Sequence, residues 1–400
     1  MVMNRAEKQS EAKPLPIFAL GFRPFYLLAI ILAAVALPVW LGVYFGIIAP
    51  SGYLSGIAWH SHEMLFGFVV AVIAGFLLTA VRNWTGMPTP SGIALSVLAG
   101  IWLLARILMW TGPAALAAVV DLTFLPALAV AIAIPIARSR NRRNFKVLLI
   151  LVGLGGANLA FHLTMLGVLP VGVDRLSIVV TLDIIMILMA IMAGRVIPAF
   201  TRNAVPGAHP RQALGIEVLA LGSLVLILIA EISSFWFAID TMLWCALFAT
   251  AAIMHAIRLL LWQPFRTRHD PLLWMLPVAY AWIPVALFFR AVAMLPTGIP
   301  ETVAFHALTT GAMASLMTAM MTRSALGHTG RELKAGGIEI NVFLLIQAAA
   351  LTRIVPGLIW PRHYPTYMTV SAGLWSLAFI VFLSRYWSIL SRSRIDGKPG

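Results

Sequence analysis

The chain has 400 residues, of which 61% are hydrophobic and 10% are charged, whereas an ordinary soluble domain is about one quarter charged. This composition excludes a sizeable water-soluble domain, and a single cysteine, Cys245, excludes disulfide scaffolds and Cys-ligated zinc or iron–sulfur sites. The formal net charge of +14 would indicate nucleic acid only if the Lys and Arg side chains formed a solvated patch.

Twelve apolar runs are long enough to cross a bilayer as helices, since a crossing takes about 20 residues. We expect them at 24–46, 58–80, 91–111, 114–136, 146–168, 173–196, 213–232, 236–257, 273–294, 301–322, 338–358 and 366–388. We expect no cleavable signal before the first run, because residues 1–15 are polar and the run is too long for a signal core. The predicted fold class is therefore an all-α polytopic membrane protein, with residues 1–400 as one integral membrane domain and polar cytoplasmic tails at 1–15 and 389–400.

The basic residues orient this stack, because cytoplasmic loops retain Lys and Arg. With the N-terminus inside, 23 of the 28 basic residues fall on the inner side. The five on the outer side are Arg106, Arg175, Arg290, Arg353 and Arg362. This bias predicts that both termini are cytoplasmic and that the bilayer, not nucleic acid, explains the positive charge.

Ionisable groups inside spans are costly and therefore mark functional candidates. Ten of them collect in the predicted outer half of the membrane: His60, His62, Glu63, Arg106, Asp121, His162, Asp183, Arg290, Glu301 and His306. The competing interpretation of any one of them is a structural hydrogen bond or ion pair between helices. Their convergence at one depth favours a shared site.

The histidines are spaced for metal chemistry. A haem needs neutral imidazoles on facing helices within an apolar enclosure, and either His60 or His62 with His306 fits this need. His60 and His62 lie about 200° apart on a helical wheel, so one helix can serve two centres on opposite faces. His162 is the natural further ligand for copper, which imidazole suits.

Acids and arginines near these histidines have expected supporting roles. Glu63 and Asp121 are candidates for orienting imidazole N–H groups, and Asp183 and Glu301 complete the acids beside the histidines. Arg106 and Arg290 are candidates for pairing with haem propionates. On the inner side, His255 at the end of the eighth span and His328 in a glycine-flanked loop form a weaker candidate site, since most polar groups there have a structural explanation.

The second, sixth and tenth spans share a layout, in which each enters from outside and carries His62, Asp183 or His306 in its outer part. The second and tenth also share a His-x4-Gly pattern, ending at Gly67 and Gly311. This repeat predicts three four-helix units around a pseudo-threefold axis.

Several segments in combination resemble the NnrS family of bacterial membrane proteins. They are Pro16-Ile17-Phe18 to Gly21-Phe22-Arg23-Pro24-Phe25, Trp59-His60-Ser61-His62-Glu63-Met64, Asn83-Trp84-Thr85-Gly86, Gly194-Arg195-Val196-Ile197-Pro198, Thr201-Arg202-Asn203, His306-Ala307-Leu308-Thr309 and Leu326-Gly327-His328-Thr329-Gly330-Arg331. Arg82 departs from the Pro that we expect before Asn-Trp-Thr-Gly. The resemblance implies a protein of the inner membrane that contains haem, with b-type expected, and copper, and that acts in the response to nitric oxide and nitrosative stress in denitrifiers and pathogens.

The twelve spans are also similar in number and layout to the catalytic subunit of heme-copper oxidases and nitric oxide reductases, a likeness of fold alone. Three functions follow as hypotheses. The first is binding or redox conversion of nitric oxide or its adducts, with an electron donor that the sequence does not identify. The second is a non-catalytic haem-binding sensor or assembly protein. The third, a copper or anion transporter, is disfavoured because the intramembrane polar groups crowd one half of the membrane.

Overall fold

The computed structural model describes residues 15–398 apart from 51, 55, 141–143 and 297–298, and within these residues it contains helices and no strands. Twelve spans in this part of the chain are long and apolar enough to cross a membrane, one for each predicted run, which confirms the predicted fold class. Ten spans are single helices: α1 Phe22–Tyr44, α4 Gly92–Thr111, α5 Ala114–Arg138, α6 Phe145–Met165, α7 Val173–Ala204, α8 Leu214–Ser233, α9 Thr241–Leu261, α10 Pro271–Ala293, α13 Gly337–Ile359 and α14 Tyr364–Ser391. The second and tenth spans are composite: α2 Gly56–His62, η2 Glu63–Val69 and α3 Val70–Thr85, then α11 Glu301–His306, η5 Ala307–Met313 and α12 Ala314–His328.

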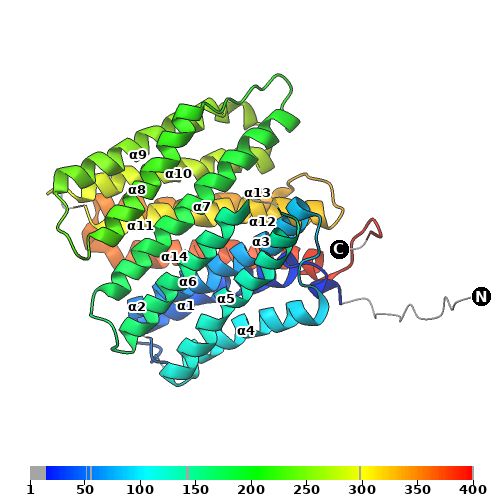
Figure 1. Ribbon diagram of the computed structural model, residues 1–400. Helices are drawn as coiled ribbons and strands as arrows, with labels where there is room; N and C mark the ends of the chain where they lie inside the picture. The colour runs from blue at the N-terminus through cyan, green and yellow to red at the C-terminus, as the bar shows by residue number, and fades with distance from the viewer. Residues whose placement is uncertain (1–14, 51, 55, 141–143, 297–298, 399–400) are drawn as a thin grey trace, which may run out of the picture.

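The outward faces of the bundle are apolar. α8 and α9, at one edge of the bundle in Figure 1, have only 22% and 28% of their most apolar windows buried. Their exposed positions include Val218, Leu219, Leu226 and Leu243. Side chains of this kind on an outer surface fit lipid and not water, so the chain is a multi-pass membrane protein. Some predicted features lie outside the described residues. They are most of the tail 1–15, two basic residues predicted on the inner side, Arg142 and Arg143, and the end of the second tail at 399–400.

Three spans form the centre of the bundle. The second, sixth and tenth spans are 30, 32 and 28 residues long, and 72–83% of their most apolar windows is buried, against at most 56% in the other spans. They also continue beyond their predicted ends, because helical hydrogen bonding does not stop where the apolar run stops. The predicted loop position of His328 is therefore wrong, since His328 is the last residue of α12.

The two composite spans share an unusual backbone feature. Each contains one π-helical segment, which begins one residue after His62 in the second span and one residue after His306 in the tenth. Gly67 and Gly311 occupy the same place in these segments, and both are sites of close approach: an added Cβ would lie 2.7 Å from Leu32 and 2.6 Å from Trp282, respectively. The two helices thus match in backbone as well as in sequence, and the threefold arrangement of units stays a prediction.

The first and last spans pack against each other and close the bundle. The indole N–H of Trp375 in α14 donates to the Ala33 carbonyl in α1 at 2.9 Å. The Arg23 guanidinium donates to the Leu390 carbonyl at 3.0 Å. The start of α1 and the end of α14 accordingly lie at the same end of the molecule (Figure 1). The histidine-rich ends of α2 and α11 lie at the opposite end.

Candidate metal centres

A buried cluster joins three helices at that opposite end. His62 ends α2, Asp121 lies in α5, and His162 lies in α6; each has at most 4% of its surface exposed. One ligand atom from each lies within 4.8 Å of the others. The His162 Nε2 atom is 3.1 Å from Asp121 Oδ2, and the His62 Nε2 atom is 3.4 Å from the same oxygen. Two imidazoles and a carboxylate are a donor set that first-row transition metals accept.

The Nδ1 atom of each of these two imidazoles contacts a further polar side chain. His62 Nδ1 lies 3.1 Å from Glu63 Oε1, and His162 Nδ1 contacts the hydroxyl of Tyr53. Burial raises the pKa of this Tyr53 hydroxyl, and the nearby Glu63 carboxylate raises it further, so the phenol stays protonated. Partners of this kind fix the ring orientation and direct the Nε2 atoms of both histidines toward Asp121.

His62 has no acceptable neutral tautomer in this arrangement. The Asn158 amide donates to Asp121 Oδ2 at 2.7 Å, which turns its carbonyl oxygen toward His62 Nε2 at 3.2 Å. Both ring nitrogens of His62 therefore face acceptor oxygens, whereas a neutral imidazole has one N–H only. A positive charge at Nε2, either a proton or a metal ion, resolves the conflict.

The charge count of the cluster agrees with this need. Arg106 donates to Glu63 Oε1 at 3.1 Å and also pairs with Asp121. Two carboxylates and one guanidinium leave one negative charge if the histidines are neutral. A buried net charge is costly, so one added cation brings the cluster to neutrality.

His60 and His306 line a separate cavity of about 490 Å³. The His60 ring stacks on Trp40, with 4.5 Å between ring centroids, and its buried Nδ1 atom has no hydrogen-bond partner among the described residues. His306 Nδ1 donates to the Thr302 carbonyl at 2.7 Å, which leaves the lone pair on Nε2. Each ring therefore retains an available nitrogen.

The remaining lining of this cavity is mainly apolar with cations at one side. Phe68, Leu182 and Trp375 contribute apolar surface, Arg353 and Arg175 contribute positive charge, and Asp174 contributes a carboxylate. Arg353 is 9% exposed and donates to the Tyr364 hydroxyl at 2.5 Å. A volume in the usual range for cofactor sites, an apolar lining and fixed positive charge are the features that a planar group with carboxylates requires.

The structure thus separates the predicted residues into two centres on opposite sides of α2. His60 faces the cavity of His306, and His62 faces Asp121 and His162. Glu63 and Arg106 join the second group. Arg106 lies outside the cavity, since its guanidinium is occupied by Glu63 and Asp121.

Three predicted residues lie elsewhere. Arg290 donates to Asp183 at 2.6 Å, pairs with Glu231 and covers the Phe248 ring at 4.3 Å, which forms a separate buried ion cluster. Glu301 pairs with the exposed Arg175 near the mouth of the cavity. These contacts account for the charges of Arg290 and Asp183 without a ligand.

The inner-side candidates do not form one site. His255, which lies inside α9 and not at its end, contacts the Tyr280 hydroxyl at 2.5 Å and the Ala220 carbonyl at 3.0 Å. His328 packs on the Phe22 ring at a centroid distance of 5.6 Å. Both side chains have contacts typical of helix packing.

Sequence reasoning did not select Tyr53 or Arg353 as site residues. Tyr53 lies in the connection between α1 and α2, where no periodic pattern signals a position. Arg353 carried a usable signal, because an arginine inside the apolar run of α13 needs a partner or a ligand. It was counted only as one of the five outer basic residues.

Comparison with known proteins completes this description. No curated protein matches the chain. The family described as NnrS protein matches residues 16–394, which include both histidine centres and all twelve spans. The chain therefore belongs to the NnrS family.

Proposed function

We propose that this chain holds copper at His62, His162 and Asp121, and haem between His60 and His306, and that it binds or converts nitric oxide or its adducts there. Family membership links the chain to the response to nitric oxide. One observation carries the copper assignment: both ring nitrogens of His62 face acceptor oxygens, in a cluster whose net charge is −1 if the histidines are neutral. The side chains of Glu63 and Tyr53 would orient the two imidazoles toward the ion.

The cavity of His60 and His306 fits haem by the chemistry of its lining. His60 Nδ1 lacks a partner, His306 keeps Nε2 available, and the volume is about 490 Å³. Arg353 would pair with a propionate, whereas Arg175 at the same cavity is already paired with Glu301. Bound haem would supply electron transfer and, where only one of the two histidines binds the iron, a binding position for nitric oxide; a copper ion at the other centre would supply a further electron or binding position. Trp40 and Phe68, which line the cavity, would help to exclude water from it.

Four single variants test the two centres independently. In protein purified from haem-replete cells, His62→Ala and His162→Ala should lose copper, measured by elemental analysis, and keep the Soret band. His60→Ala and His306→Ala should lose the Soret band and keep copper. His209→Ala, in an exposed loop, is the control that keeps both. A colourless, copper-free wild-type protein would contradict the proposal.

Steady-state consumption of nitric oxide then decides the type of function. Consumption with an added electron donor, lost together with the Soret band, supports a redox enzyme. Stoichiometric binding without consumption supports a sensor or assembly protein. Metal flux into sealed vesicles would instead support the transporter.

A further inference from the structure

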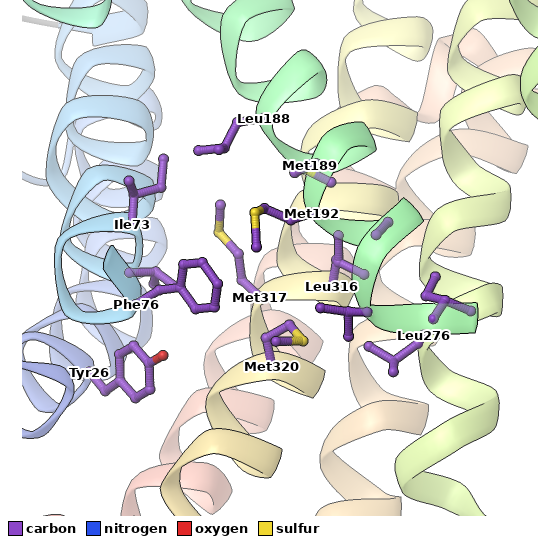
Figure 2. Close-up of a pocket in the computed structure, with 14 residues that line it drawn as sticks. Tyr26, Ile73, Phe76, Leu188, Met189, Met192, Leu276, Leu316, Met317 and Met320 are labelled. Carbon is purple, nitrogen blue, oxygen red and sulfur yellow. The ribbon is translucent and has the colours of Figure 1, made fainter. Parts of the chain in front are cut away.

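A second cavity lies between the three central spans, away from both histidine centres. Its volume is about 70 Å³, and Figure 2 shows its lining side chains arranged between α3, which carries Ile73 and Phe76, α7 and α12. Thirteen of its fourteen lining residues are aliphatic, Met or Phe, and the remaining one is Tyr26. The Tyr26 hydroxyl is already engaged with the Ser324 hydroxyl at 3.1 Å.

The lining excludes most classes of ligand. Water in a cavity needs two to four polar partners, and this lining has none to spare. An ion would be buried without an opposite charge, since the lining contains no acid and no base. Four thioethers, from Met189, Met192, Met317 and Met320, supply polarisable atoms that interact by dispersion. The cavity therefore suits a small, neutral, apolar molecule.

This methionine cavity lies in line with the histidine cavity along the same helices. Val69, Leu182 and Thr310 line the histidine cavity, and Val72, Leu188 and Leu316 line the methionine cavity. The separations along the chain are three to six residues, or about 5–9 Å of helix. A molecule in the methionine cavity is thus one or two helical turns from the neighbourhood of His60 and His306.

We propose that the methionine cavity binds small apolar gas molecules, and that it is a reservoir for nitric oxide in line with the histidine cavity. The identity of the gas rests on the proposed function, whereas the binding of an apolar gas atom does not. Apolar gases partition into the bilayer that surrounds these spans, and the cavity is partly open to its surroundings.

Xenon tests the binding directly. Crystals of the detergent-purified protein, pressurised with xenon, should show anomalous scattering in the methionine cavity. Ala193→Leu fills the cavity and should reduce xenon occupancy about tenfold, the change that a loss of 1.4 kcal/mol produces. Val196→Phe is a second filling variant in case the first does not fold. Met317→Leu keeps an apolar lining and should keep xenon. No xenon in the wild type, or wild-type xenon occupancy in both filling variants, overturns the proposal.

The role as a reservoir is tested by flash photolysis of bound nitric oxide in protein that carries haem. The wild type should show a rebinding phase that does not depend on nitric oxide concentration, and Ala193→Leu should lose it. Unchanged rebinding in Ala193→Leu overturns the reservoir. Xenon bound to colourless protein would leave gas binding intact and contradict only the proposed function. A Cu(I) ion that is lost in Met192→Leu and Met317→Leu would make the cavity a thioether metal site and overturn gas binding.

Discussion

At the scale of single residues, Asp121 is the group on which the buried cluster depends. Its two carboxylate oxygens form hydrogen bonds with Arg106, Asn158 and His162, and the Nε2 atom of His62 lies 3.4 Å from one of them. Glu63 alone would balance the charge of Arg106, but the second amino group of the guanidinium would then lose its charged acceptor. Hydrogen bonds to a charged group contribute about 1.5–3 kcal/mol, and a buried donor that loses its acceptor is costly.

Asp121→Asn should therefore lower the free energy of unfolding by about 1.5–3 kcal/mol and abolish copper binding. Thermal unfolding in detergent, followed by tryptophan fluorescence, measures the first effect, and elemental analysis measures the second. Glu301→Gln breaks the exposed pair with Arg175, whose side chain is 73% exposed, and should cost below about 1 kcal/mol. Equal destabilisation by the two variants would contradict the special role of the buried carboxylate.

Some of these residue contacts were predictable and others were not. Asp121 and Arg106 belong to helices joined by a two-residue connection, and Asn158 and His162 share one helical face, so local geometry brings each pair together. The assignment of His60 and His62 to opposite faces also follows from local geometry. The partner of Arg290 does not, because Asp183 is 107 residues away in the chain and only helix packing selects it over a ligand.

At the scale of helices, the two π-helical segments determine which faces of the second and tenth spans point toward the neighbouring helices. A π turn holds more residues than an α turn and shifts the faces of the helix beyond it. Gly67 and Gly311 lie inside these segments at close approaches to Leu32 and Trp282. Helix lengths were predicted from apolar runs, but no wheel drawn at 100° per residue anticipates a π segment, because its cause is tertiary packing.

Gly311→Ala should destabilise the protein by about 1–3 kcal/mol, the usual cost of overpacking. The added methyl group would lie 2.6 Å from the Trp282 ring, and this ring is fixed by the hydrogen bond from its N–H to Gln347 at 2.9 Å. At Gly67 the nearest atom is the end of the flexible Leu32 side chain, but the buried Arg106 guanidinium lies 3.0 Å from the added Cβ, so Gly67→Ala should cost a similar amount. Melting temperatures in detergent provide the comparison.

Gly222→Ala in α8 is the matched control, because nothing lies within 4 Å of an added Cβ there. It should leave stability unchanged or raise it by up to about 1 kcal/mol, since Ala favours a helix over Gly. A Gly311→Ala variant as stable as this control would show that Trp282 can move aside without cost.

At the scale of the whole molecule, twelve spans and the distribution of basic residues were readable from the sequence, because lipid imposes length and charge rules on each span separately. The spatial neighbours of each span were not readable, since apolar faces carry little information about their partners. The orientation of the bundle in the membrane remains the prediction of positive charge inside.

Cysteine labelling at the two ends of α7 tests this orientation. In a Cys245→Ala background, Val171→Cys precedes the helix at a site that is 98% exposed, and Ala204→Cys ends it. In intact spheroplasts an impermeant maleimide should label position 171 and not position 204, and should label both after lysis. Labelling of position 204 alone in intact spheroplasts would invert the topology.

The packing of α14 on α1 has a consequence for how the protein is made. The ribosome delivers α1 before the other spans and α14 after them, so the face of α1 that contacts Trp375 lacks this partner until the twelfth span has been translated. Insertion can proceed span by span, but the bundle closes only when the final helix arrives. A chaperone or neighbouring lipid must cover that face of α1 during synthesis, and a stop codon before Tyr364 would leave it uncovered in every copy.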